Sequence, residues 1–278
     1  MELLTDIELT EIAEAVIKLT RLERWQAIDA AMSIHDKKWI AGLVPRFSAM
    51  EKEVNDKIDS HLAPLFQRAR EPESQKAGEI QIKASVEQLL PDEGKWRVIF
   101  EEFGQLMLPG IISDAGQTGI NVIMGVSFDI RNPRVTEFIE NKKFKFAKEI
   151  TETTANQLRE QLRAGLLDGE GIPQLKKRVK EVFTDAKTWR AEMIARTETG
   201  GAYNFGSFEG YKQSGVVAYK EWLATKDNRT RDSHQHMDGQ RQLLDNRFSN
   251  GLMYPGEPNG AIEEIVNCRC SIAPIVEE

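Results

Sequence analysis

The feature that most constrains this chain is a pair of cysteines, Cys268 and Cys270, near its C-terminal end. They are its only cysteines, and a single residue separates them. In an extended strand, side chains two residues apart point to the same face. A disulfide between them would close a very short ring, which the geometry of that bond disfavours. The two thiols are therefore expected to share one environment.

Two of the four histidines, His234 and His236, lie about thirty residues earlier and could complete a Cys2His2 set for structural zinc. The spacing of both pairs is tighter than in common zinc motifs. Two other interpretations stay open: a small packed strand with two buried free thiols, and a catalytic metal. Zinc would tie the polar loop of residues 227–240 to the last strand, which the sequence otherwise leaves poorly supported.

The residues around these pairs form an ordered set of motifs: Ile194–Thr199, Trp222, Asp227, Arg229, Arg231, His234, Asp238–Gly239, Pro255–Gly256 and Asn267–Cys270. This set, over residues 190–275, resembles the Mu F-like minor head proteins of tailed bacteriophages, also called phage head morphogenesis proteins. The stretch from Phe128 to Asp185 also resembles what precedes these motifs in the family. His234 matches the histidine of the family's R-x-x-H motif, whereas His236 has no clear counterpart.

The resemblance implies a minor capsid protein, a virion component that acts in head assembly or DNA delivery and is no enzyme. Its expected partners are the portal, the major capsid protein and, as a further candidate, packaged DNA; no membrane is involved. We expect it in the host cytoplasm during assembly and then in the head interior of a phage or prophage particle. The alternative is a metal-dependent nuclease or related hydrolase that uses His234, His236 and Asp227.

The composition of the chain indicates which class of protein it belongs to. With 40% hydrophobic and 29% charged residues, the 278-residue chain is expected to fold as a soluble protein. Its net charge of −7 argues against a broad, non-specific grip on DNA. The N-terminal sequence carries acids and no basic region, so we expect no signal peptide. No apolar run is long enough to predict a transmembrane helix.

The predicted fold class is α+β: a helical N-terminal region over 1–127 and a head morphogenesis domain over 128–278. Within that domain we expect helices in 128–215 and a small β module in 216–278. Helices are predicted over 5–33, 35–62 with a break or kink at Pro45, from about 80 past Pro91, from Asn132–Pro133, from Thr151 or Thr153 to Gly169, over 172–183 and over 188–213. Residues 70–79 read as a linker, and the glycine-rich stretch 104–125 as either close helix packing or irregular chain. Strands are predicted over 216–222 and 264–275.

One acidic residue, Glu198, falls on the apolar stripe of the helix predicted over 188–213. A buried carboxylate needs a partner, so Glu198 is predicted to pair with Arg229, Arg231 or Arg269 unless it lies at a solvated edge of the helix. We expect a structural polar core, with no catalytic or cofactor-binding residues. Its expected members are Arg196, Glu198, Asp227, Arg229, Arg231, Asp238, Asn267 and Arg269.

Overall fold

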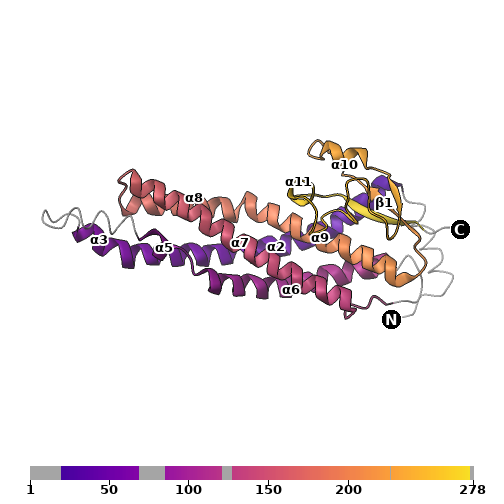
Figure 1. The fold of residues 1–278 in the computed structure, drawn as a ribbon, viewed down its shortest axis with the longest axis horizontal. Helices are drawn as coiled ribbons and strands as arrows, with labels where there is room; N and C mark the ends of the chain where they lie inside the picture. The colour runs from indigo at the N-terminus through magenta and orange to yellow at the C-terminus, as the bar shows by residue number, and fades with distance from the viewer. Residues whose placement is uncertain (1–19, 69–84, 121–126, 226, 276–278) are drawn as a thin grey trace. The chain divides into compact units, whose positions relative to one another are not determined.

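The structure is a computed structural model that describes residues 20–68, 85–120, 127–225 and 227–275 (Figure 1). Long helices are followed by a small sheet, which confirms the α+β class. In chain order the elements are α2 Arg21–Lys57, the π-helix η1 Ile58–Leu62, α3 Ala63–Arg68, α5 Val86–Leu89, α6 Glu93–Ile120, α7 Pro133–Leu167, α8 Ile172–Lys187, α9 Trp189–Ser214, β1 Tyr219–Leu223, α10 Asp232–His236, β2 Arg241–Leu243, α11 Ile262–Ile265 and β3 Ser271–Ile275. None of the described helices combines the length and apolar character that a membrane span requires.

Helix α2 is longer than predicted, since neither Ser33 nor Pro45 interrupts it. Pro45 is exposed, so water can satisfy the carbonyl that its missing N–H leaves free. The opposite face of the helix buries a run of apolar residues on both sides of the proline: Trp39, Leu43, Phe47, Met50 and Val54. Packing of this continuous face outweighs the local preference of one proline. The linker expected at 70–79 lies outside the described residues.

Helix α7 is a single element where a second helix was expected to begin at Thr151 or Thr153. Thr151 does not cap a new helix, because its hydroxyl donates to the carbonyl of Ala147 in the preceding turn. Thr154 does the same with Ile150. The start at Pro133 is confirmed, and so are the glycines that follow α7 and α9, Gly169 and Gly215, both with φ of +72°. The stretch 104–120 is helical in α6.

The chain divides into two compact units, each made of separate stretches of sequence. Unit 1 holds the described residues within 1–39, 105–142 and 193–278, and unit 2 those within 40–104 and 143–192. In unit 2 an aromatic cluster forms the core, where Phe100 contacts Phe47 and Phe146 at centroid distances of 5.9 and 6.0 Å. Unit 1 contains the sheet. The expected domain boundary at 127/128 stays a prediction.

The sheet of unit 1 has the order β2-β1-β3, with both neighbours antiparallel to β1. Trp222 of β1 lies opposite Ile272 of β3. Side chains of α9 attach to the last strand, since Tyr211 donates to the carbonyl of Ile272 and Asn204 to that of Cys270. Figure 1 shows the sheet beside α9, with α10 and α11 near it.

The last strand is shorter than predicted. It begins at Ser271, so the strand expected over 264–275 is wrong for its first half. Ile262–Ile265 form the short helix α11, and Asn267 adopts a φ of +57°, a left-handed conformation that no strand contains. Cys268 and Cys270 therefore lie in the loop that leads into β3.

Candidate functional site

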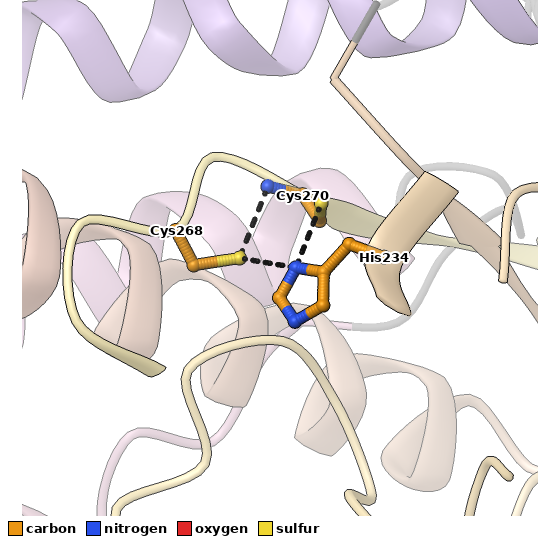
Figure 2. A group of neighbouring side chains, drawn as sticks. All are labelled: His234, Cys268 and Cys270. Carbon is orange, nitrogen blue, oxygen red and sulfur yellow. Dashed lines mark hydrogen bonds between the residues drawn. The ribbon is translucent and has the colours of Figure 1, made fainter. Parts of the chain in front are cut away.

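Three buried side chains, His234, Cys268 and Cys270, meet at one point of unit 1 (Figure 2). The Nδ1 atom of His234 lies 3.4 Å from the sulfur of Cys268 and 3.4 Å from that of Cys270. The backbone N–H of Cys270 points back to the Cys268 sulfur at 3.4 Å, which shows how tightly the loop turns. The shared environment expected of the two thiols is thus present, although a loop creates it.

His234 is held in place on its other side as well. Its Nε2 lies 2.8 Å from Oε2 of Glu264, at the site's edge on α11. Trp222 packs against the imidazole ring edge-on, with centroids 5.2 Å apart. The histidine is 1% exposed. Glu264 has no place among the predicted site residues, because its role depends on the unpredicted helix α11.

His236 does not join this cluster, so the predicted four-residue ligand set is wrong in that member. It is exposed, and its Nδ1 bonds to the carbonyl of Asp232, one turn earlier in α10. Two residues advance a helix by about 200°, so neighbours at this spacing face opposite sides. The segment 227–240 is predicted as a loop, in which the two histidines would not be constrained in this way.

The three residues of the cluster shift one another's pKa values. A hydrogen bond from Cys268 lowers the pKa of the Cys270 thiol to about 5 against the effect of burial, and His234 lowers it further. The same bond, together with burial, raises the pKa of Cys268 well above its usual value. Burial lowers the pKa of His234, but Cys270 and Glu264 outweigh it and the pKa is raised. Cys270 therefore carries thiolate character beside a polarised imidazole.

A small cleft of about 40 Å³ opens onto all three residues. That volume accommodates a few water molecules and no larger substrate. Its remaining walls are the polar residues that the sequence singled out together with two threonines: Arg196, Thr225, Asp227, Arg229, Thr230, Arg231, Asn267 and Arg269.

Most of these wall residues are held by other polar groups. Asp227 pairs with Arg269 and, at 3.3 Å, with Arg229. Arg231 donates to the backbone carbonyl of Val266, and the N–H of Asn267 donates to Thr197 of α9 at 2.9 Å. The contacts of Asp227 with Arg269 and of Arg231 with Val266 connect the segment 227–231 to the loop that carries the cysteines, and the bond of Asn267 connects that loop to α9.

Asp238, another predicted member of the polar core, lies outside the cleft wall. Its Oδ1 accepts from the N–H of Ala224 at 3.1 Å, and its Oδ2 lies 3.6 Å from Arg21. Arg196 lines the cleft and acts electrostatically on Asp36 of α2.

Glu198 has a different partner from the arginines predicted for it. Its Oε2 lies 3.1 Å from Nζ of Lys142 on α7, and both side chains are buried. The pairing with Arg229, Arg231 or Arg269 is therefore corrected. A signal was present in the sequence, since Lys142 continues the apolar stripe formed by Val135 and Ile139.

Two residues of α9 outside the predicted site, Asn204 and Gly200, support the cysteine loop. Asn204 donates to the carbonyl of Cys270 and accepts from Ser271, both at 3.0 Å. Gly200 lies so close that a Cβ placed there would meet the carbonyl oxygen of Cys268 at 3.1 Å. A side chain at 200 would push the loop outward, and an apolar residue at 204 would leave two buried polar groups unpaired.

Comparison with known proteins places this region in a family. Residues 156–273 match the family described as Phage Mu protein F like protein. That span includes α9, β1, β2, the start of β3 and all three clustered residues. No solved structure matches the chain.

Three relatives illustrate the range of proteins that share sequence with it. The protein YqbB of Bacillus subtilis is 27% identical over 64% of this chain and 62% of its own length. The minor head protein GP7 of Bacillus phage SPP1 is 29% identical over 41% of this chain and 38% of its own length. The NAD(+)–arginine ADP-ribosyltransferase EFV of Enterococcus faecalis is 29% identical over 53% of this chain and 30% of its own length. The chain spans less than two thirds of the length of each of these relatives. The resemblance drawn from the motifs is confirmed: residues 156–273 match the Phage Mu protein F like family, the phage head morphogenesis proteins.

Proposed function

We propose that this chain is a minor head protein of a tailed bacteriophage and a component of the virion. The observation that carries the proposal is the family match over residues 156–273, which encloses the candidate site and its support on α9. The similarity to a protein named as a minor head protein of phage SPP1 adds to it. We further propose that the chain contacts the portal or the major capsid protein inside the head and acts in head assembly or DNA delivery.

We also propose that the site has a structural role and is not catalytic. The cleft of about 40 Å³ is too small for a nucleotide, and the carboxylate of Asp227 is engaged by arginines. The alternative hydrolase needed His234, His236 and Asp227 together, whereas among the described residues the cluster joins His234 to the cysteines. The transferase name belongs to a relative of which this chain covers 30%, so no such activity is proposed here.

The direct experiment is to purify heads of the phage that encodes the chain, or heads assembled from its co-expressed portal, scaffold and major capsid proteins. We expect the chain to sediment with assembled heads and to be found there by mass spectrometry. A chain that stays at the top of the gradient, with heads of normal composition and yield formed without it, would refute the proposal.

The structural role has its own test. Purified protein is incubated with plasmid DNA in the presence of magnesium, manganese or zinc ions, and no cleavage is expected. Reproducible cutting that His234→Ala abolishes and His236→Ala retains would establish an enzyme instead.

A further inference from the structure

We propose that His234, Cys268 and Cys270 bind one zinc ion through Nδ1 and the two sulfurs, with water on the cleft side as the fourth ligand. The proposal concerns a site of the folded domain and holds whether or not the chain is a head component. It leaves out His236, the weaker of the two predicted histidine ligands, and puts water in the fourth position.

The distances from Nδ1 of His234 to the two sulfurs fit a shared metal as well as they fit hydrogen bonds, and the sharing of one nitrogen by two sulfurs favours the metal. Zinc binds cysteine sulfur at about 2.3 Å and histidine nitrogen at about 2.0 Å, so a tetrahedral angle separates these atoms by roughly 3.5 Å. Both observed separations are 3.4 Å. A single ring nitrogen has one lone pair or one proton and cannot bond fully to two sulfurs at once. A cation between the three atoms satisfies all of them.

The far side of the imidazole supports the same assignment. Glu264 lies 2.8 Å from Nε2, where a carboxylate accepts the N–H of a metal-bound histidine. This contact fixes the tautomer with the proton on Nε2 and leaves the lone pair of Nδ1 directed at the sulfurs. Figure 2 shows Nδ1 facing both cysteines and the other ring nitrogen facing away from them.

The donor set selects the kind of metal. Two thiolates and one imidazole are soft to borderline ligands, which favour zinc over magnesium or calcium. The charges also balance, because two thiolates neutralise a divalent cation in a place where all three ligands are buried. The cleft adjoins all three residues and has room for the water that completes four-coordination.

A metal at this point would join two segments that lie more than thirty residues apart in the sequence. His234 belongs to α10, in the polar stretch 227–240, and the cysteines belong to the loop before β3. Through Asn204 that loop is bonded to α9. Zinc would thus fix the C-terminal module onto its supporting helix, and removal of the ion would loosen the module.

The test is the metal content of the full chain purified without chelator from zinc-supplemented cells. We expect close to one zinc per chain in the parent protein and in His236→Ala, which alters an exposed neighbour on the same short helix. Cys268→Ser and Cys270→Ser should lose the ion. Glu264→Gln should fold and bind zinc roughly 10- to 100-fold more weakly, measured by competition with a chromophoric chelator.

A second readout does not depend on how well the cysteine variants fold. Cobalt added to metal-free parent protein should produce thiolate-to-cobalt absorption at one equivalent, and the same titration of His236→Ala should match it. A parent protein without zinc and without this absorption, whose melting temperature a chelator leaves unchanged, would overturn the proposal. So would a metal that His236→Ala removes or that Cys268→Ser retains.

Discussion

Glu198 of α9 and Lys142 of α7 form an ion pair in the interior of unit 1, with Nζ and Oε2 3.1 Å apart. Their side chains are only 10% and 8% exposed. Removing one partner of such a pair leaves a buried charge without compensation. The packing of α9 against α7 at this point therefore depends on both residues of the pair.

The first prediction concerns this pair. Glu198→Ala should lower the free energy of unfolding by about 3–5 kcal/mol, because the ammonium of Lys142 stays buried without its carboxylate. The double variant Glu198→Leu with Lys142→Met should be more stable than Glu198→Leu or Lys142→Met alone. Urea denaturation measures all of them, and strictly additive losses would show that the two groups do not interact.

The second prediction concerns acid stability in unit 2. Burial raises the pKa of Glu53, but hydrogen bonds from Lys95, the N–H of Asp92, Lys57 and Trp96 outweigh it and hold the pKa at about 2. Because this folded-state pKa lies below the ordinary 4.5, the carboxylate stabilises the fold above pH 4.5. That stability, about 3 kcal/mol, is lost as the pH falls from 4.5 towards 2.

Glu53→Gln should therefore cost stability at pH 7 and flatten the dependence on pH between 4.5 and 2. Glu149→Gln, which alters an exposed carboxylate of α7, serves as the matched control and should behave like the parent. Equal acid sensitivity in all three proteins, followed by circular dichroism, would contradict the assignment.

The third prediction concerns Asn204. Asn204→Ala removes the donor to the Cys270 carbonyl and the acceptor of Ser271, and each buried unpaired group costs about 1–3 kcal/mol. Asn204→Asp keeps the acceptor but loses the donor and buries a carboxylate beside the Cys270 carbonyl, so it should cost at least as much as Asn204→Ala. If both variants unfold at the parent's denaturant midpoint, α9 does not hold the cysteine loop by this residue.

The fourth prediction separates backbone strain from close packing at Gly256. Its φ is +77°, and a Cβ there would lie 2.9 Å from the Cα of Gly201 on α9. Gly251 has a similar φ of +81° but open space around it. Gly251→Ala should cost about 1–2 kcal/mol for the left-handed conformation alone. Gly256→Ala should cost clearly more, and equal losses would show that the contact with Gly201 is not tight.

Most of the helices could be predicted from the sequence, because they depend on local signals. Apolar spacing marks the helices, Pro133 marks a start, and Gly169 and Gly215 mark ends. Predictions failed where packing overrode a local signal. Of the break or kink predicted at Pro45, the break is absent because the apolar face of the helix continues past it. Thr151, predicted as a candidate cap, lies within a helix instead.

Three of the four residues predicted as zinc ligands lie together in the structure, whereas a bound metal stays a proposal. His234, Cys268 and Cys270 come together, but His236 does not, since the short helix α10 turns it away. Glu264 and Asn204 were missed because their roles depend on contacts between residues 30 and 66 positions apart. Lys142 was missed for the same reason, although its place on an apolar stripe marked it as unusual.

X-ray absorption at the zinc edge, recorded on parent protein purified without chelator, tests the site most directly. A zinc ion bound by His234, Cys268 and Cys270 should show two sulfur neighbours at about 2.3 Å and two nitrogen or oxygen neighbours at about 2.0 Å. His236→Ala should give the same spectrum. A bound zinc with no sulfur neighbour, or a protein with no zinc edge at all, would contradict it.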